Sequence, residues 1–534
     1  MVTAVDIKSP GSTDKHAGSS LSIATLIMMG SVFVSRVIGL LREMILAHYG
    51  GTSFQMDAYV TAFIIPELLN HFLAGGFLSI TFIPIFQRHL VNNREDLAWK
   101  AFSNLFSTGT IVFLIVIAVT YCFVPDILRR LGPKINDTET FPLTVHLTRI
   151  ILPAQLFFFW GALLSAAQMA HKKFFLPALA PLGYNSGIIM GGVLLGSRIG
   201  IEGFAWGVIG GACIGNFMLQ IPGALRCGMR FRPRWDLTDP DLLTYLRKTL
   251  PLILGLGMTV SNEIFFRFFG SFLPEGATSS VNYALRTSGI LVAMFGQASG
   301  VAFYPYLTRL AAEKKFEEME RMFHSVIKKI AVYLIPLSAV LCVVAEPVIS
   351  VLYQRGKFTA TSTTETAGVF SVYLIGCFML SMSFIVIRAF YAMQNMVLPM
   401  VISTATAVAT IPLYIIFSKI FGARGIALAA ITGATVQCVV VYALWIQRYG
   451  TGKEVASIGA LLGKVILVTA GVTLAGLQLR RWIVSVNPFE DVFIKNSFII
   501  LCIAPVMLAM MFFLFDRSGI QRFKESVAGL LRRK

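Results

Sequence analysis

Charged residues inside apolar segments are the first candidates for chemistry in this sequence. Arg36, Arg42 and Asp57 lie in or beside two long apolar stretches near the N-terminus. A charge at the centre of a membrane helix costs at least about 2.5–3.5 kcal/mol, so such a residue usually faces a polar cavity and has a function there. Guanidinium groups stay charged and bind phosphate or carboxylate through two parallel hydrogen bonds. The sequence therefore predicts an anion-binding cavity inside a membrane protein.

A second group of charges lies in the corresponding part of the C-terminal half. Glu263 and Arg267 are four residues apart, so they share a helix face and are predicted to form a local ion pair. Internal pairing is also the alternative for Arg42, with Asp57 as its partner. The residues predicted to bind substrate are Arg36, Arg42 and Arg286. The residues predicted to act in gating or ion pairs are Asp57, Glu263 and Arg267.

The composition determines which elements hold these charges. Hydrophobic residues make up 56% of 534 positions and charged residues 13%, and the mean hydropathy is +0.74. Apolar segments of helical length recur along the chain without strand-type alternation, so we predict an all-α polytopic membrane protein. About fourteen transmembrane helices are expected on this basis. They lie near residues 21–49, 57–87, 101–124, 141–170, 175–197, 201–225, 242–272, 278–310, 325–352, 365–392, 398–420, 423–447, 457–479 and 496–516.

The chain carries 45 Lys and Arg against 27 Asp and Glu, a formal charge of +18. In a membrane protein such an excess belongs in cytoplasmic loops and against anionic lipid, so we do not expect nucleic acid as a partner. The larger set of basic loops includes both tails. We therefore predict a multi-pass protein of the bacterial inner membrane with both termini cytoplasmic.

Several motifs recur at one offset. Leu176-Pro177 returns as Leu398-Pro399, and Gly200-Ile-Glu-Gly203 returns as Gly422-Ala-Arg-Gly425, both 222 positions later. Ordered matches of this kind predict two parallel six-helix bundles around a central cavity, with two further helices at the C-terminus. The predicted parts are a disordered cytoplasmic tail (1–20), an N-terminal bundle (21–225), a basic cytoplasmic linker (226–241), a C-terminal bundle (242–450), and two extra transmembrane helices with a basic tail (451–534).

Other chemistry has no sequence support. Gly463-Lys464 is followed by Val465, so the phosphate-binding loop of an ATPase is missing there. The histidines and seven cysteines are not spaced as metal ligands. We predict a transporter and not an enzyme, with no catalytic residues, cofactor or metal. Its expected driver is the membrane potential or a gradient of sodium ions or protons.

A set of ordered motifs resembles a known family. Ser35-Arg36-Val-Ile-Gly39-Leu-Leu-Arg42-Glu-Met44, followed by Asp57-Ala-Tyr and Phe63-Ile-Ile-Pro66, is similar to the opening signature of the MurJ (MviN) lipid II flippases. Phe272-Leu-Pro-Glu-Gly276 leading to Tyr283-Ala-Leu-Arg286 extends the resemblance, which covers roughly residues 21–450. It implies the fold of the MOP superfamily and export of an undecaprenyl-pyrophosphate-linked peptidoglycan precursor. On this pattern Arg36, Arg42 and Arg286 match essential cavity arginines, and Asp57 matches a conserved acid.

The sequence departs from the family pattern at several charged positions. Asn70 and His71 stand where the family usually has two arginines, and we place them in a secondary part of the cavity. Leu285 replaces an Asp before Arg286, and Gly289 stands where an acid is usual. Two interpretations follow: a divergent paralogue that carries a different lipid-linked glycan, or a pyrophosphate held by fewer arginines.

We therefore predict an alternating-access flippase that moves lipid II from the cytoplasmic to the periplasmic leaflet, for peptidoglycan and cell-wall biogenesis. Its expected partners are a lipid-linked anionic glycan, membrane lipids and cell-wall synthesis proteins. The alternatives are a flippase for another lipid-linked glycan, a multidrug exporter of the same superfamily, and a non-transporting scaffold of cell-wall synthesis. A cation exporter would favour net acid in its cavity, whereas arginine exceeds acid here. A scaffold has no need of costly buried charges.

Overall fold

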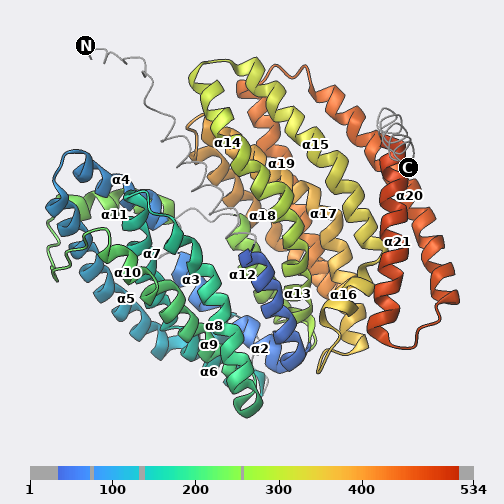
Figure 1. Ribbon diagram of the computed structural model, residues 1–534, viewed down its shortest axis with the longest axis horizontal. Coiled ribbons are helices and arrows are strands. Elements are labelled where there is room, and N and C mark those ends of the chain that lie inside the picture. Colours follow the sequence, from blue (N-terminus) through green and yellow to red (C-terminus); the bar gives the residue numbers. More distant parts are fainter. Residues whose placement is uncertain (1–33, 72–76, 132–138, 254–257, 516–534) are drawn as a thin grey trace, which may run out of the picture. The chain divides into compact units, whose positions relative to one another are not determined.

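The computed structural model describes residues 34–71, 77–131, 139–253 and 258–515, and all its regular elements are helices (Figure 1). The prediction of an all-α membrane protein is confirmed. Eleven helices in these ranges are long and apolar enough to cross a bilayer. The three remaining predicted spans, near 21–49, 57–87 and 242–272, each include residues outside the described ranges. The count of fourteen therefore stays a prediction.

The chain divides into two compact units that interleave along the sequence. The first unit comprises Met1–Arg42, Ile65–Val124 and Leu147–Ile253, and the second comprises Glu43–Ile64, Pro125–His146 and Leu254–Lys534. The sequence predicted two consecutive bundles, yet residues 43–64 and 125–146 pack with the C-terminal half. Hydrogen bonds described below hold residues 43–64 there. The predicted domain boundaries follow the sequence repeat, and they stay a prediction.

The first unit contains part of the helix over residues 34–50 and most of the helices before residue 254. Its elements are α3 (Ile64–Leu69), α4 (Phe77–Val91), α5 (Glu95–Leu131), α6 (Thr140–Ile151), α7 (Ala154–Ala170), α8 (Phe175–Ile199), α9 (Glu202–Gly211), the π-helical segment η3 (Ala212–Met218), α10 (Gln220–Leu225) and α11 (Pro240–Ile253). The second unit includes Ile64 of α3, residues 125–131 of α5 and residues 140–146 of α6, which are the larger part of that helix.

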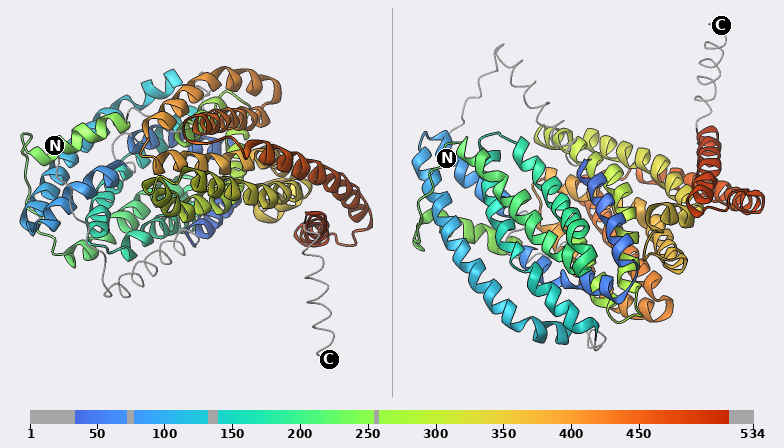
Figure 2. Two further views of the ribbon diagram at one scale, coloured as in Figure 1. Left: turned by 90° about the horizontal axis from the view of Figure 1, so that it is seen from above. Right: turned by 60° about the horizontal axis from the view of Figure 1, so that its bottom comes forward.

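The second unit contains α2 (Phe54–Ala62) and the helices after residue 257. They are α12 (Met258–Gly270), α13 (Ala277–Leu291), the π-helical segment η4 (Val292–Gln297), α14 (Ala298–Ala312), α15 (Phe316–Val343), α16 (Ala345–Tyr353), α17 (Ala360–Ala392), α18 (Val397–Phe421), α19 (Ala423–Tyr449), α20 (Val455–Val486) and α21 (Val492–Phe515). The views in Figures 1 and 2 show α20 and α21 at one edge of this unit.

The internal repeat is visible in backbone geometry. Helices α8 and α18 each contain 25 residues, and their bounds differ by the same 222 positions. Gly200 ends the first with φ 62° and ψ −135°, and Gly422 ends the second with φ 58° and ψ −134°. Only glycine adopts a positive φ with such a ψ at little cost. The two halves therefore share one helix–turn–helix design.

Glycines set the distance between α8 and α9 in the first unit. Gly183, Gly187 and Gly191 recur every four residues along one face of α8. A Cβ on Gly187 would lie 2.3 Å from the Cα of Gly211, and one on Gly191 would lie 2.4 Å from the Cα of Gly207. Backbone contact of this kind is how helices associate in lipid, where no hydrophobic gain drives packing.

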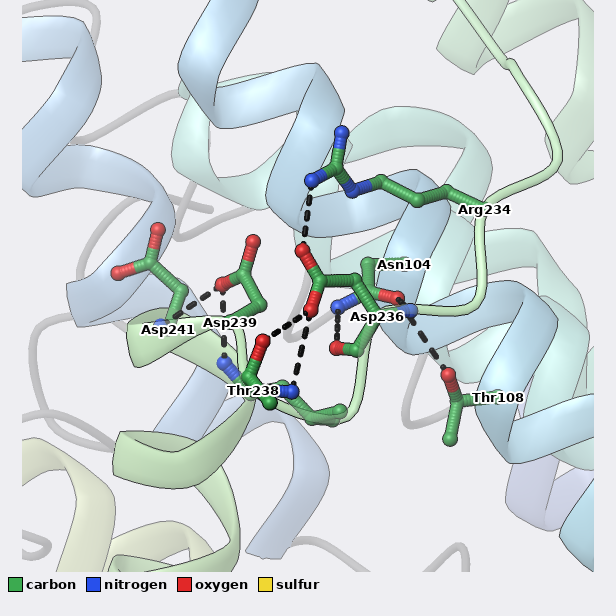
Figure 3. A network of polar contacts seen from close by, with 8 residues as sticks. Asn104, Thr108, Arg234, Asp236, Thr238, Asp239 and Asp241 are labelled. Atoms are coloured by element: carbon green, nitrogen blue, oxygen red, sulfur yellow. Dashed lines mark hydrogen bonds and ion pairs between the residues drawn. The ribbon is translucent and has the colours of Figure 1, made fainter.

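The linker predicted for residues 226–241 is tied to α5 through a polar network (Figure 3). Asn104 donates to the backbone carbonyl of Asp236 at 2.8 Å and accepts from its backbone N–H at 2.9 Å. The Asp236 carboxylate accepts from the side chains of Thr238 and Arg234, both at 2.7 Å. These bonds lower the pKa of Asp236 to about 2. These hydrogen bonds therefore fix the linker against α5 within the first unit.

The C-terminal helices are held to α15 at two places in the second unit. Buried Glu320 accepts hydrogen bonds from the backbone N–H groups of Thr451 and Gly452, at 2.7 and 3.1 Å. Lys328 pairs with Glu454 at 2.5 Å. Further along, an apolar cluster joins the end of α15 to α20 and α21. The loop before α20 is thus fixed by carboxylate contacts, and the two extra helices are fixed by apolar packing.

Candidate functional site

Glu263 of α12 holds two arginines in the second unit. Its carboxylate accepts from Arg286 Nη1 at 2.9 Å and Nη2 at 3.0 Å, so this pair is bidentate. Arg267 Nη2 approaches the same carboxylate at 3.2 Å, as the spacing of four residues led us to expect. Arg267 also lies over the ring of Phe266, 5.0 Å from its centroid. One acid therefore serves two cations.

The two arginines differ in exposure. The Arg267 side chain is 3% exposed, Glu263 is 23% exposed, and Arg286 is 34% exposed. Arg267 is consequently a buried partner that neutralises Glu263. Arg286 is the more accessible of the two arginines, and the Glu263 carboxylate occupies the edge of its guanidinium that a phosphate group would bind. An anionic ligand can take the place of Glu263 on Arg286 while Glu263 keeps Arg267.

Asp57 lies at the start of helix α13 in the second unit. Its carboxylate accepts from the backbone N–H of Gly276 at 2.6 Å and of Ser279 at 2.7 Å, at the start of α13. A carboxylate there satisfies free N–H groups and complements the helix dipole. Within the second unit Asp57 pairs with no arginine. Asp57 therefore caps the start of α13, and its predicted role in gating or in an ion pair with Arg42 stays a prediction.

The cap is reciprocal. Glu275, just before α13, accepts at 2.8 Å from the backbone N–H of Phe54, the first residue of α2. Tyr283 donates its hydroxyl to the carbonyl of Gly51 at 3.1 Å, and Asn282 donates to Glu43 at 3.2 Å. These bonds tie residues 43–57 to α13 and explain why they belong to the second unit.

Arg42 lies in the first unit, on the helix over residues 34–50. Its Nη1 donates to Asn185 Oδ1 at 2.9 Å, and Asn185 donates to the carbonyl of Pro181 at 2.9 Å. Asn185 is thereby oriented to accept from the guanidinium. Arg36 is exposed on the same helix. Because Arg36 and Arg286 belong to different units, the predicted convergence of their side chains stays a prediction.

Asn70 and His71 lie in the first unit, at a short π-helical turn. Asn70 donates to Gln155 Oε1 of α7 at 3.1 Å. The neighbouring Ala74-Gly75-Gly76 falls outside the described residues. Asn70 therefore forms a neutral contact between helices at a position where the family resemblance implied positive charge. The secondary cavity proposed for this pair stays a prediction.

Sequence reasoning missed Arg388 of α17. Its side chain is half-buried and crosses α14 at Gly300, where an added Cβ would lie 2.9 Å from both Cδ and Nε of Arg388. It forms no ion pair with any residue that the structure describes. A single arginine inside the apolar run 360–392 was the available signal. Across the described ranges, no group of three His, Cys, Asp or Glu side chains is placed to hold a metal ion.

Comparisons with known proteins agree on one family. The family model "Lipid II flippase MurJ" matches residues 46–492. The lipid II flippase MurJ of Burkholderia cenocepacia is 29% identical over 463 residues, which cover 85% of this chain and 89% of that protein. The probable lipid II flippase MurJ of Vibrio cholerae is 26% identical over 465 residues, with coverages of 84% and 86%.

Solved structures of transporters share the fold. A structure described as lipid II flippase MurJ, inward closed conformation, has a TM-score of 0.73 and 21% identity, and it covers 91% of this chain and 99% of that chain. An inward-facing multidrug resistance MATE transporter of the MOP superfamily has a TM-score of 0.60 and 13% identity, with coverages of 80% and 95%. The prediction of a multi-pass membrane transporter, and not an enzyme, is confirmed. This chain belongs to the lipid II flippase MurJ family, as its motifs predicted.

Proposed function

We propose that this protein moves lipid II from the cytoplasmic to the outer leaflet of the bacterial inner membrane by alternating access, with both termini cytoplasmic. The observation that carries the proposal is the partly exposed, bidentate Arg286–Glu263 pair, whose carboxylate also contacts buried Arg267. Membership of the family supplies the substrate class: a polyprenyl diphosphate bearing a peptidoglycan precursor.

The pair provides a reversible anion switch. Glu263 accepts two hydrogen bonds from the guanidinium of Arg286. A diphosphate oxygen displaces that carboxylate because two charge-assisted bonds to phosphate replace two to carboxylate. Glu263 then remains neutralised by Arg267, so release of Arg286 leaves no isolated buried charge. The exchange therefore leaves both the Glu263 carboxylate and the Arg286 guanidinium with a charged partner.

Arg36 and Arg42 are the proposed contacts from the first unit. Asn185 accepts a hydrogen bond from Arg42 Nη1 and so orients the guanidinium group that we propose contacts the anion. The membrane potential or a sodium or proton gradient is the proposed driver. Moving one charge across 100 mV supplies about 2.3 kcal/mol, which biases a cycle with an anionic load. Cell-wall synthesis proteins remain proposed partners.

A flippase for another lipid-linked glycan is the second candidate. The observation that favours it is the neutral Asn70–Gln155 contact at a position where the family usually has arginine. Complementation separates the two candidates. The gene is expressed in a strain depleted of its own lipid II flippase, with Arg286→Ala as the inactive control. Growth with the wild type alone supports lipid II. Membrane-inserted wild-type protein without growth would favour the other glycan.

A further inference from the structure

A cavity of about 310 Å³ lies outside the arginine site, between η4–α14 and α15 of the second unit. The residues from α15 recur every three or four positions, so they form one face of that helix. The lining comprises Met294, Phe295, Ser299 and Phe303 on one side, and Val326, Lys329, Ile330 and Tyr333 on the other. Val326 and Ile330 are only 3% and 5% exposed, so these two side chains form the floor of the cavity, and that floor is apolar.

One cation stands at the rim of this cavity. Lys329 is exposed and forms no ion pair with any residue in the described ranges. The preceding residue, Lys328, is already neutralised by Glu454 at 2.5 Å. No carboxylate contributes to the lining. The cavity therefore combines an apolar floor, aromatic walls and one available positive charge.

These properties specify the ligand. A soluble anion would leave the apolar floor exposed, and a neutral hydrocarbon would not use the ammonium group. A zwitterionic headgroup carries a cation for which this lining offers no acid. A volume of about 310 Å³ is at the lower limit of ligand sites, so it suits part of one lipid chain and not a whole amphiphile.

We propose that the cavity binds an anionic phospholipid, with an acyl chain against Val326 and Ile330 and the phosphate at Lys329. Tyr333 is 65% exposed one helical turn from Lys329, so its hydroxyl is available as a second donor to the phosphate. The lipid comes from the leaflet on the side of the loop between α14 and α15. The site lies within the second unit and does not depend on which glycan the protein transports.

Binding to purified full-length protein tests the proposal. Delipidated protein is titrated with phosphatidylglycerol, phosphatidylcholine or inorganic phosphate, and bound lipid is counted by native mass spectrometry. Lys329→Ala removes the charge at the rim, and Ser299→Phe fills the cavity while keeping the charge. Arg448→Ala is the matched control, because Arg448 is an exposed cation of α19 that does not line the cavity. The melting temperature of each variant confirms folding.

We expect phosphatidylglycerol to bind more tightly than phosphatidylcholine. Lys329→Ala should weaken it about fivefold, the effect of roughly 1 kcal/mol for one lysine at an anionic lipid surface. Ser299→Phe should abolish this binding, and Arg448→Ala should leave it unchanged. Equal affinity of the wild type and Lys329→Ala would overturn the proposal. So would equal binding of the two lipids, binding of inorganic phosphate alone, or displacement of phosphatidylglycerol by undecaprenyl diphosphate at equal concentration.

Discussion

Substituting Glu263 tests whether one carboxylate serves two arginines. Glu263→Ala removes the carboxylate that contacts both Arg267, whose side chain is 3% exposed, and Arg286, which is 34% exposed. Removing one partner of a buried ion pair costs about 3–5 kcal/mol. Because Glu263 itself is 23% exposed, we expect a loss near the lower limit, about 3 kcal/mol of unfolding free energy.

Arg286→Ala should have the opposite profile. It leaves Glu263 paired with Arg267, and a partly exposed ion pair contributes about 1 kcal/mol or less. Stability should therefore change little while transport is lost. Arg286→Lys keeps the charge but loses the planar fork, so it should retain partial transport.

The assay is unfolding of purified protein by sodium dodecyl sulfate in mixed micelles, followed by circular dichroism. Glu365→Ala, at an exposed carboxylate of α17, is the matched control and should stay within about 0.5 kcal/mol of the wild type. The double variant Glu263→Leu with Arg267→Met should recover most of the loss, because apolar replacement of a buried pair is close to neutral. If Glu263→Ala were as stable as Glu365→Ala, the shared-carboxylate interpretation would be wrong.

Four further outcomes are expected. Asp57→Ala should lower the unfolding free energy by about 2–3 kcal/mol in the same titration, because the start of α13 loses two charge-assisted hydrogen bonds; equal stability would exclude a capping role. Gly187→Ala should reduce the monodisperse fraction in size-exclusion chromatography, because its Cβ would lie 2.3 Å from the Cα of Gly211. Gly210→Ala should not, because a Cβ there would meet no atom within 4 Å. Arg388→Ala should slow lipid transport without loss of folded protein, and an unchanged rate would remove it from the transport pathway. The pKa of Asp236 is about 2 in the folded protein, below its usual value, so its contribution to stability is complete above about pH 4. That contribution is lost as pH falls towards 2, and limited proteolysis of the linker should show this loss in the wild type but not in Asp236→Asn.

The sequence was sufficient to predict the fold class because each membrane-spanning helix requires one long run of apolar residues. Long apolar runs predicted the helices, and one repeated offset predicted matching halves. The turns at Gly200 and Gly422 show that the offset reflects backbone geometry. Even the local pair of Glu263 with Arg267 followed from helical spacing alone.

Contacts between distant segments were beyond that reasoning. Asp57 was assigned to gating or an ion pair from its charge, and its contacts with backbone N–H groups at the start of α13 were not foreseen, because every sequence carries such groups equally. Glu263 was given one arginine, because nothing in spacing brings Arg286 from the next helix to the same carboxylate. Arg388 was overlooked because its interest lies in having no ion-pair partner in the described part of the chain, which only the three-dimensional structure shows.

The most direct test of the central claim is transport of fluorescent lipid II by the purified protein in sealed vesicles. A membrane potential is imposed, and lipid II reaching the opposite leaflet is measured with a quencher that cannot cross the bilayer. We predict transfer well above that of empty vesicles, abolished by Arg286→Ala and retained by Arg448→Ala. Transfer by the wild type at the rate of empty vesicles, or full transfer by Arg286→Ala, would contradict the account.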